Sequence, residues 1–88
     1  MKGELTVVKV LPDWNGMVAY SMQRMFMSVD MLAYQIGCAR QHVSKVMWTP
    51  NHKDSTKAKV EAGLESYARS QNIDFDLIWP PEKRTRIP

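Results

Sequence analysis

The chain has 88 residues, of which 44% are hydrophobic and 24% charged, and its net charge is +3. This composition supports one small hydrophobic core, and it argues against a disordered chain and against a second domain. No stretch approaches the ~20 apolar residues that a transmembrane helix needs, and the single cysteine excludes an intrachain disulfide.

The first 16 residues are predicted to form a β-strand followed by a turn. The segment ELTVVKVLP, residues 4–12, is rich in β-branched residues and partly alternates, which is typical of a short strand. A single strand needs a partner, either a second copy of the chain or another segment. The sequence DWNG, residues 13–16, is typical of a turn.

A first helix is predicted within residues 17–27, where apolar side chains recur at helical spacing. Its predicted inward positions are Val18, Met22, Met25 and Phe26. Most of the seven methionines lie in this region, and methionine fills irregular gaps in a core well. We therefore assign these methionines to the core; a methionine-rich groove for a partner is the alternative.

Two short helices are predicted next, on either side of Gly37. Ser28 is a suitable N-cap for a helix over residues 29–36, and Gly37 ends it, because glycine adopts the left-handed conformation at low cost. The predicted inward positions of this helix are Val29, Leu32, Ala33 and Ile36. A further helix over residues 39–48 buries Val43, Val46 and Met47.

A fourth helix is predicted after a loop over residues 49–55, with Asp54 or Ser55 as its cap and an end near residues 71–72. Its predicted inward residues are Val60, Leu64, Tyr67 and Ala68, and its predicted outward residues are Lys57, Lys59, Glu61 and Glu65. Gly63 costs about 1 kcal/mol relative to alanine within a helix, so we expect it to mark a close contact between helices.

The C-terminal segment DFDLIWPP, residues 74–81, is predicted to be a short helical turn or an extended piece. It covers the core with Phe75, Leu77, Ile78 and Trp79. The predicted organisation is therefore a strand and turn over residues 1–16, a helical domain over residues 17–80, and a loose basic tail over residues 81–88.

Residues 29–48 fit the pattern of a helix-turn-helix, the arrangement in which a second helix enters the DNA major groove. A small residue, Ala33, lies four positions before Gly37, and the apolar Ile36 directly precedes it. Val43 and Val46 follow the glycine at the spacing of buried positions in the second helix.

Three segments carry a resemblance to known families. MLAYQIGCARQHVSKVMW resembles the helix-turn-helix of phage Cro/CI-type and LacI-type repressors, and STKAKVEAGLESY is similar to the helix that follows it in LacI-type headpieces. The ending IDFDLIWP resembles that of Ner-like phage regulators. The resemblance covers residues 29–80 and implies a mainly α, lambda-repressor-like bundle of four to five helices, to which the N-terminal strand is added. It implies a phage or mobile-element regulator; because the chain has no large ligand-sensing domain, inducer control of the LacI kind is not implied.

The resemblance places base contacts at the start of the second helix, at Arg40 and Gln41, with Ser44 and Lys45 further along on bases or phosphates. Arginine binds guanine and glutamine binds adenine through paired hydrogen bonds. Contacts to the DNA backbone are expected from Ser28, Tyr34, Gln35, His52, Lys53 and Lys57. The alternative is that these are ordinary solvated side chains. Trp48, at the end of the helix, has no obvious role.

The charge distribution agrees with a polyanionic partner. Residues 1–37 contain three basic and three acidic residues, whereas residues 38–70 contain six basic and three acidic ones. The missing signal-peptide pattern and the lone Cys38 favour the cytoplasm. His42 and His52 with one cysteine do not provide the ligands of a zinc site, and no catalytic arrangement stands out.

We therefore expect a sequence-specific regulator that binds double-stranded DNA as a homodimer. We expect no enzymatic activity, cofactor, metal, small-molecule ligand or membrane association. The dimer element is either the strand at residues 4–12 or the segment DLIWPP, residues 76–81. The alternatives are a protein-binding adaptor or inhibitor that retains the helix-turn-helix shape, and an excisionase-like DNA-architectural protein.

Overall fold

The computed structural model describes residues 14–49 and 51–85, and every regular element within these ranges is helical. The elements are α2 (Trp14–Arg24), α3 (Val29–Ile36), α4 (Arg40–Trp48), α5 (Asp54–Ser70), α6 (Phe75–Ile78) and the 3-10 turn η1 (Pro81–Lys83). The mainly α fold class is confirmed. The predicted strand over residues 4–12 lies outside the described residues.

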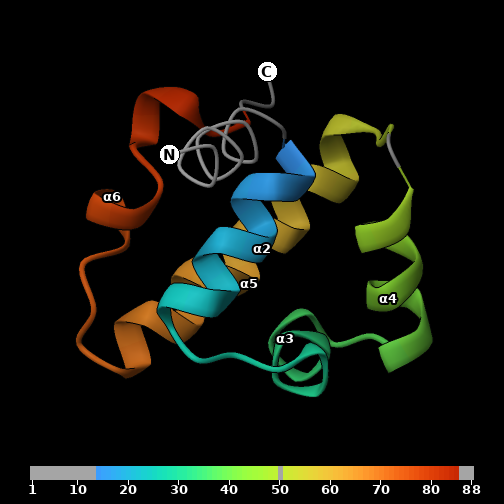
Figure 1. The fold of residues 1–88 in the computed structure, drawn as a ribbon, viewed down its shortest axis with the longest axis horizontal. Helices are drawn as coiled ribbons and strands as arrows, with labels where there is room; N and C mark the ends of the chain where they lie inside the picture. The colour runs from blue at the N-terminus through green and yellow to red at the C-terminus, as the bar shows by residue number, and fades with distance from the viewer. Residues whose placement is uncertain (1–13, 50, 86–88) are drawn as a thin grey trace, which may run out of the picture.

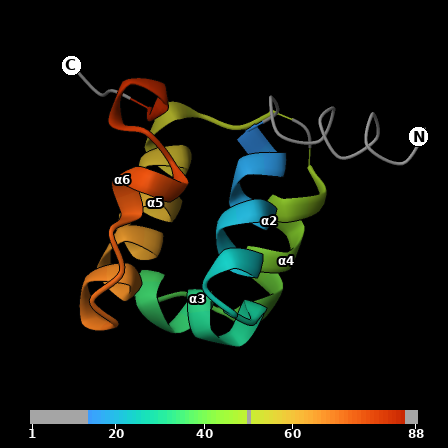
Figure 2. The same ribbon diagram turned by 60° about the vertical axis from the view of Figure 1, so that its left-hand side comes forward.

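The 17-residue helix α5 is the centre of the bundle and packs against α2, α3 and α6. Helix α3 lies across one end of α2 and α5, and α4 lies beside α2 on the side away from α6 (Figures 1 and 2). The helices enclose one core, formed by Val18, Met22, Met25, Met27, Leu32, Ala33, Val43, Val46, Val60, Leu64, Ala68, Phe75, Ile78 and Trp79.

Helix α2 begins at Trp14, so the predicted turn over residues 13–16 is wrong for Trp14, Asn15 and Gly16. The first two of these side chains bond to other helices. The indole nitrogen of Trp14 donates to Glu61 in α5 at 2.8 Å, and the Asn15 amide donates to backbone carbonyls at the end of α4. These tertiary contacts outweigh the turn preference of an Asn-Gly pair.

The end of α2 corrects the prediction for Phe26, which is 90% exposed rather than inward. Helix α2 ends at Arg24, and Phe26 has a left-handed φ of 55°. The backbone reversal brings the N–H of Met27 to 2.8 Å from the carbonyl of Met22 and places Met27 in the core instead. Helical periodicity cannot be extended through such a reversal, so Met27 replaces Phe26 as the buried residue.

Helix α3 has the predicted bounds because both of its ends are set by local residues. The Ser28 hydroxyl accepts a hydrogen bond from the backbone N–H of Met31 at 3.2 Å, and the N–H of Ser28 contacts the Met31 sulfur at 3.4 Å. Gly37 ends the helix with φ 82°. Leu32 and Ala33 are buried as predicted, whereas the helix-end residues Val29 and Ile36 are only half-buried.

Helix α5 begins without a side-chain cap. Lys53 is its N-cap residue, and the predicted caps Asp54 and Ser55 already lie inside the helix. The close approach predicted at Gly63 is confirmed, since a Cβ atom there would lie 2.8 Å from Cγ1 of Ile36 in α3. Of the predicted inward residues, Tyr67 alone is half-buried rather than buried.

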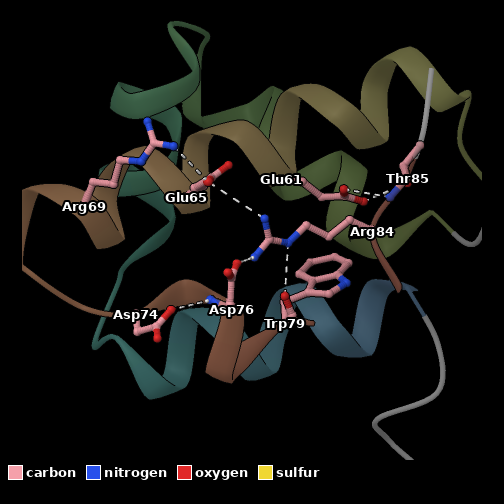
Figure 3. A network of polar contacts seen from close by, with 8 residues as sticks. All are labelled: Glu61, Glu65, Arg69, Asp74, Asp76, Trp79, Arg84 and Thr85. Carbon is pink, nitrogen blue, oxygen red and sulfur yellow. Dashed lines mark hydrogen bonds and ion pairs between the residues drawn. The ribbon is translucent and has the colours of Figure 1, made fainter. Parts of the chain in front are cut away.

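Glu61 is only 5% exposed, so its predicted outward orientation is wrong. Its carboxylate accepts a hydrogen bond from the indole of Trp14 at 2.8 Å. It also accepts from the hydroxyl and the backbone N–H of Thr85, at 2.7 and 2.9 Å (Figure 3). Glu61 therefore joins the start of α2 and the C-terminal segment to α5. Three donors compensate the burial of this carboxylate.

The C-terminal segment differs from the prediction in two ways. Leu77 is 81% exposed, because the four-residue helix α6 turns Phe75 and Ile78 to the core and Leu77 to solvent. The tail is not loose over residues 81–85. Arg84 donates to the backbone carbonyl of Trp79 at 3.0 Å and pairs with Asp76 and Glu65 (Figure 3).

Candidate nucleic-acid interface

A three-residue turn, residues 37–39, joins α3 to α4. The backbone N–H groups of Gly37 and Cys38 both donate to the carbonyl of Ala33, at 2.8 and 3.1 Å. Cys38 is half-buried and packs against the core, and Ala39 is the extended N-cap residue of α4. The predicted break at Gly37 is confirmed, and α3 and α4 run in different directions before and after it (Figure 2).

Helix α4 has one buried and one exposed side. Val43 and Val46 lie in the core, and Met47 packs against it half-buried. On the opposite side, the predicted contact residues Arg40, Gln41 and Lys45 are exposed, Ser44 is half-buried, and Trp48 is exposed. The predicted outward orientation of these side chains agrees with the structure.

The end of α4 is held by Asn15, a residue that the sequence analysis assigned to a turn. Its amide nitrogen lies 2.9 Å from the carbonyl oxygen of Met47, 2.8 Å from that of Thr49 and 3.5 Å from that of Val46. The last carbonyls of a helix lack an N–H group one turn further along. That of Val46 also accepts from the backbone N–H of Thr49 at 3.3 Å, and Asn15 from α2 supplies a donor to those of Met47 and Thr49. An Asn-Gly pair reads locally as a turn, and no local signal shows this long-range contact.

The start of α4 carries an ion pair that is weakly held. Nε of Arg40 lies 3.3 Å from the carboxylate of Asp30 in the first turn of α3, and both side chains are 70% exposed. Exposed pairs of this kind contribute little and are screened by salt. The guanidinium of Arg40 can therefore exchange this partner for another anion or for a hydrogen-bond acceptor.

The region that includes α4 and the start of α5 is electropositive. Helix α4 contains no acidic residue, and residues 40–59 carry five basic side chains against the single acidic residue Asp54. The basic residues are Arg40, Lys45, Lys53, Lys57 and Lys59. Such a local excess attracts polyanions.

The predicted backbone contacts from α3 differ in accessibility. Tyr34 is exposed, and Ser28 is exposed at the N-terminus of the helix, although its hydroxyl is already occupied by the N–H of Met31. Gln35 is half-buried, and its Cβ faces Gly63 of α5 at 3.6 Å from the position of a Cβ there. Tyr34 and Ser28 are thus open to solvent, and Gln35 is less accessible.

The residues after α4 that were predicted to contact the DNA backbone also differ in how exposed they are. Lys53 is exposed, whereas His52 is half-buried with its ring centroid 5.3 Å from that of Trp14. The ammonium group of Lys57 lies 6.0 Å from the centre of the same indole ring. His52 and Lys57 thus border Trp14, and Lys53 is the residue of this group that solvent reaches freely.

Within residues 14–49 and 51–85, no cluster of three or more His, Cys, Asp and Glu side chains is arranged to bind a metal ion. Among the helices that the structure describes, none combines the length and the apolar character that crossing a bilayer requires.

Comparisons with protein-family models, with curated proteins and with solved structures found no match to this chain. The resemblance to Cro/CI, LacI-type and Ner-like regulators therefore stays a prediction.

Proposed function

We propose that this protein is a sequence-specific transcriptional regulator that reads the major groove of double-stranded DNA with α4. The observation that carries the proposal is the placement of α4. Its buried side is anchored by Val43 and Val46, and directly after the turn at Gly37 it presents Arg40 and Gln41 to solvent. This arrangement agrees with that of a recognition helix.

The exposed side chains of α4 match the chemistry of base edges. Arg40 can donate two hydrogen bonds to O6 and N7 of guanine, and Gln41 can pair in the same way with adenine, each contact contributing roughly 1–3 kcal/mol of discrimination. Lys45 and Ser44 lie further along the helix, where they can contact a base or a phosphate.

The flanking elements supply candidate phosphate contacts. Tyr34 precedes α4 in the sequence and Lys53 follows it, and both side chains are exposed. The backbone N–H groups at the N-terminus of α3, beside Ser28, can also bind a phosphate oxygen. Such contacts orient the protein without specifying a sequence. They also release counterions, so affinity falls steeply as salt rises.

We propose further that the regulator binds as a homodimer, as phage and mobile-element repressors of this kind do by resemblance. A nine-residue recognition helix makes few base contacts, and two half-sites raise both affinity and specificity. Of the two predicted dimer elements, the strand at residues 4–12 lies outside the described residues. The other, DLIWPP, contains the exposed Leu77 beside a groove of about 680 Å³ between α2 and α6.

The test is selection of bound sequences from a random DNA pool, with the full chain and with the double variant Arg40→Ala, Gln41→Ala. We expect the native chain to select a defined palindromic sequence and the variant to lose that selection. The matched control is Gln23→Ala, Arg24→Ala, which removes the same two side-chain types from exposed positions of α2. Equal selection by all three proteins would contradict the proposal.

A protein-binding adaptor is the second candidate, and the exposure of Phe26, Tyr34 and Trp48 favours it. Large exposed aromatic residues are enriched at protein interfaces. The salt response separates the two functions. A DNA complex that neutralises several phosphates weakens by orders of magnitude between low and moderate salt, whereas an apolar protein contact changes little.

A further inference from the structure

Trp48 is a large apolar side chain on the polar side of α4, and the core does not explain its position. Its side chain is 86% exposed, whereas Trp79 is buried and Trp14 is bonded to Glu61. Because its ring stays in contact with water, Trp48 does not contribute to the free protein the burial free energy that an indole can supply.

Helical geometry places Trp48 in the middle of the exposed side. Successive residues of a helix are rotated by about 100° around its axis. Measured from Arg40, the predicted DNA-contact residues of α4 therefore lie within an arc of about 140° that ends at Lys45, and Trp48 lies at about 80° in this arc. These contact residues are Arg40, Gln41, Ser44 and Lys45. Its neighbours on that surface are Ser44, one turn before it, and Gln41, two turns before it. A duplex that contacts the base-reading residues along α4 therefore lies within reach of the indole.

The backbone around Trp48 is held on both sides. The Asn15 amide donates to the carbonyls of Met47 and Thr49, the two residues that flank Trp48. The Thr49 hydroxyl donates to the carbonyl of Lys45 at 2.7 Å and closes the last turn. Because this backbone is already ordered, the indole can be immobilised on a partner at a reduced entropic cost.

We propose that Trp48 packs against the 5-methyl group of a thymine in the major groove and thereby specifies that base. The inference rests on the proposed DNA-binding function and adds a specificity residue to it. The thymine methyl is the apolar group that the base edges display in the major groove. The positive charge of Arg40 and Lys45 on the same side of α4 favours a duplex over an apolar protein surface as the partner.

The experiment compares thymine with deoxyuridine, which lacks only the methyl group, at each thymine of the selected sequence. Dissociation constants are measured for the native chain, Trp48→Ala and Trp48→Phe. For the native chain we expect one deoxyuridine substitution in a single half-site to weaken binding about fourfold, the ratio that corresponds to ~0.8 kcal/mol for one buried methyl group.

The same substitution is expected to leave the affinity of Trp48→Ala unchanged, and Trp48→Phe should retain part of the effect. Loss of the fold does not confuse the comparison, because the indole lies outside the core and each variant serves as its own reference across the two DNAs. A circular dichroism melt of each variant checks that the helical content is retained.

The outcomes separate this inference from the proposed function. If the native chain selects a sequence and every deoxyuridine substitution affects the native chain and Trp48→Ala equally, the thymine contact is wrong while DNA recognition stands. If the native chain selects no sequence, both proposals fail. Binding of a protein partner that Trp48→Ala abolishes, without DNA selection, would assign Trp48 to the adaptor function instead.

Discussion

At the scale of single residues, two polar side chains link segments that lie far apart in the sequence. Asn15 joins α2 to the end of α4 through the carbonyls of Met47 and Thr49, and Glu61 joins α5 to Trp14 and Thr85. Removing a polar group from water costs free energy, and its hydrogen bonds to other parts of the protein offset that cost. Asn15 therefore links α2 to the end of α4, and Glu61 links α5 to Trp14 and Thr85 through hydrogen bonds.

The Asn15 contact can be tested by reversing its polarity. Asn15→Ala leaves the carbonyls of α4 without their donor and should lower the free energy of unfolding by about 1–3 kcal/mol. Asn15→Asp should cost more, because a carboxylate would face carbonyl oxygens. Urea denaturation measures both effects, and Gln23→Glu at an exposed position of α2 is the charge-matched control. Equal stability of the Ala and Asp variants would contradict the contact.

At the scale of elements, the helices with local end signals were predictable, and those defined by long-range contacts were not. The bounds of α3 followed from Ser28 and Gly37, which act on their own backbone. The start of α2 did not, because Trp14 and Asn15 bind residues more than 30 positions away. The predicted inward orientation of Leu77 was wrong for a different reason. A four-residue helix such as α6 has too few positions to show a helical period.

The contact between α3 and α5 yields an element-scale prediction at Gly63. Gly63→Ala gains about 1 kcal/mol of helix propensity, but the new Cβ would meet Cγ1 of Ile36 at 2.8 Å. Overpacking of this kind costs about 1–3 kcal/mol, so we expect a net loss of stability in thermal and urea unfolding.

A double-mutant cycle checks the cause of that loss. Ile36→Ala removes the opposing atom, so Gly63→Ala should be stabilising in that background. Ser66→Ala, at an exposed position of α5, reports any general effect of alanine in the helix. Purely additive effects of the Gly63 and Ile36 substitutions would show that the two helices do not limit each other there.

At the scale of the whole molecule, the candidate DNA surface and the candidate dimer surface lie on different sides of the bundle. Helix α4 flanks α2 on one side, whereas α6 packs on α5 with the groove of Leu77 between α6 and α2 (Figures 1 and 2). The C-terminal segment is held there by Arg84 and by the contacts of Glu61 (Figure 3). A second copy could therefore bind without covering α4.

The dimer proposal predicts that Leu77→Lys shifts the protein from dimer to monomer in sedimentation velocity at micromolar concentration. A lysine at this position would remove the exposed leucine and add a further positive charge to a groove that Lys57, Lys83 and Arg84 already line. Because Leu77 is exposed, the melting temperature measured at low concentration should stay unchanged. Phe26→Lys is the control, since Phe26 is also a large exposed apolar residue but lies in the connection between α2 and α3. A monomeric native chain would exclude this interface.

What the sequence by itself determined was the helical class, the break at Gly37 and the division of α4 into a buried and an exposed side. Each of these depends on the period of a helix or on the conformation of one residue, and both are local properties. Only the tertiary structure decided the burial of Glu61, the clamp of Asn15 on α4 and the attachment of residues 81–85. These features join residues far apart in the chain, and such pairs are selected by three-dimensional packing, which no local pattern encodes.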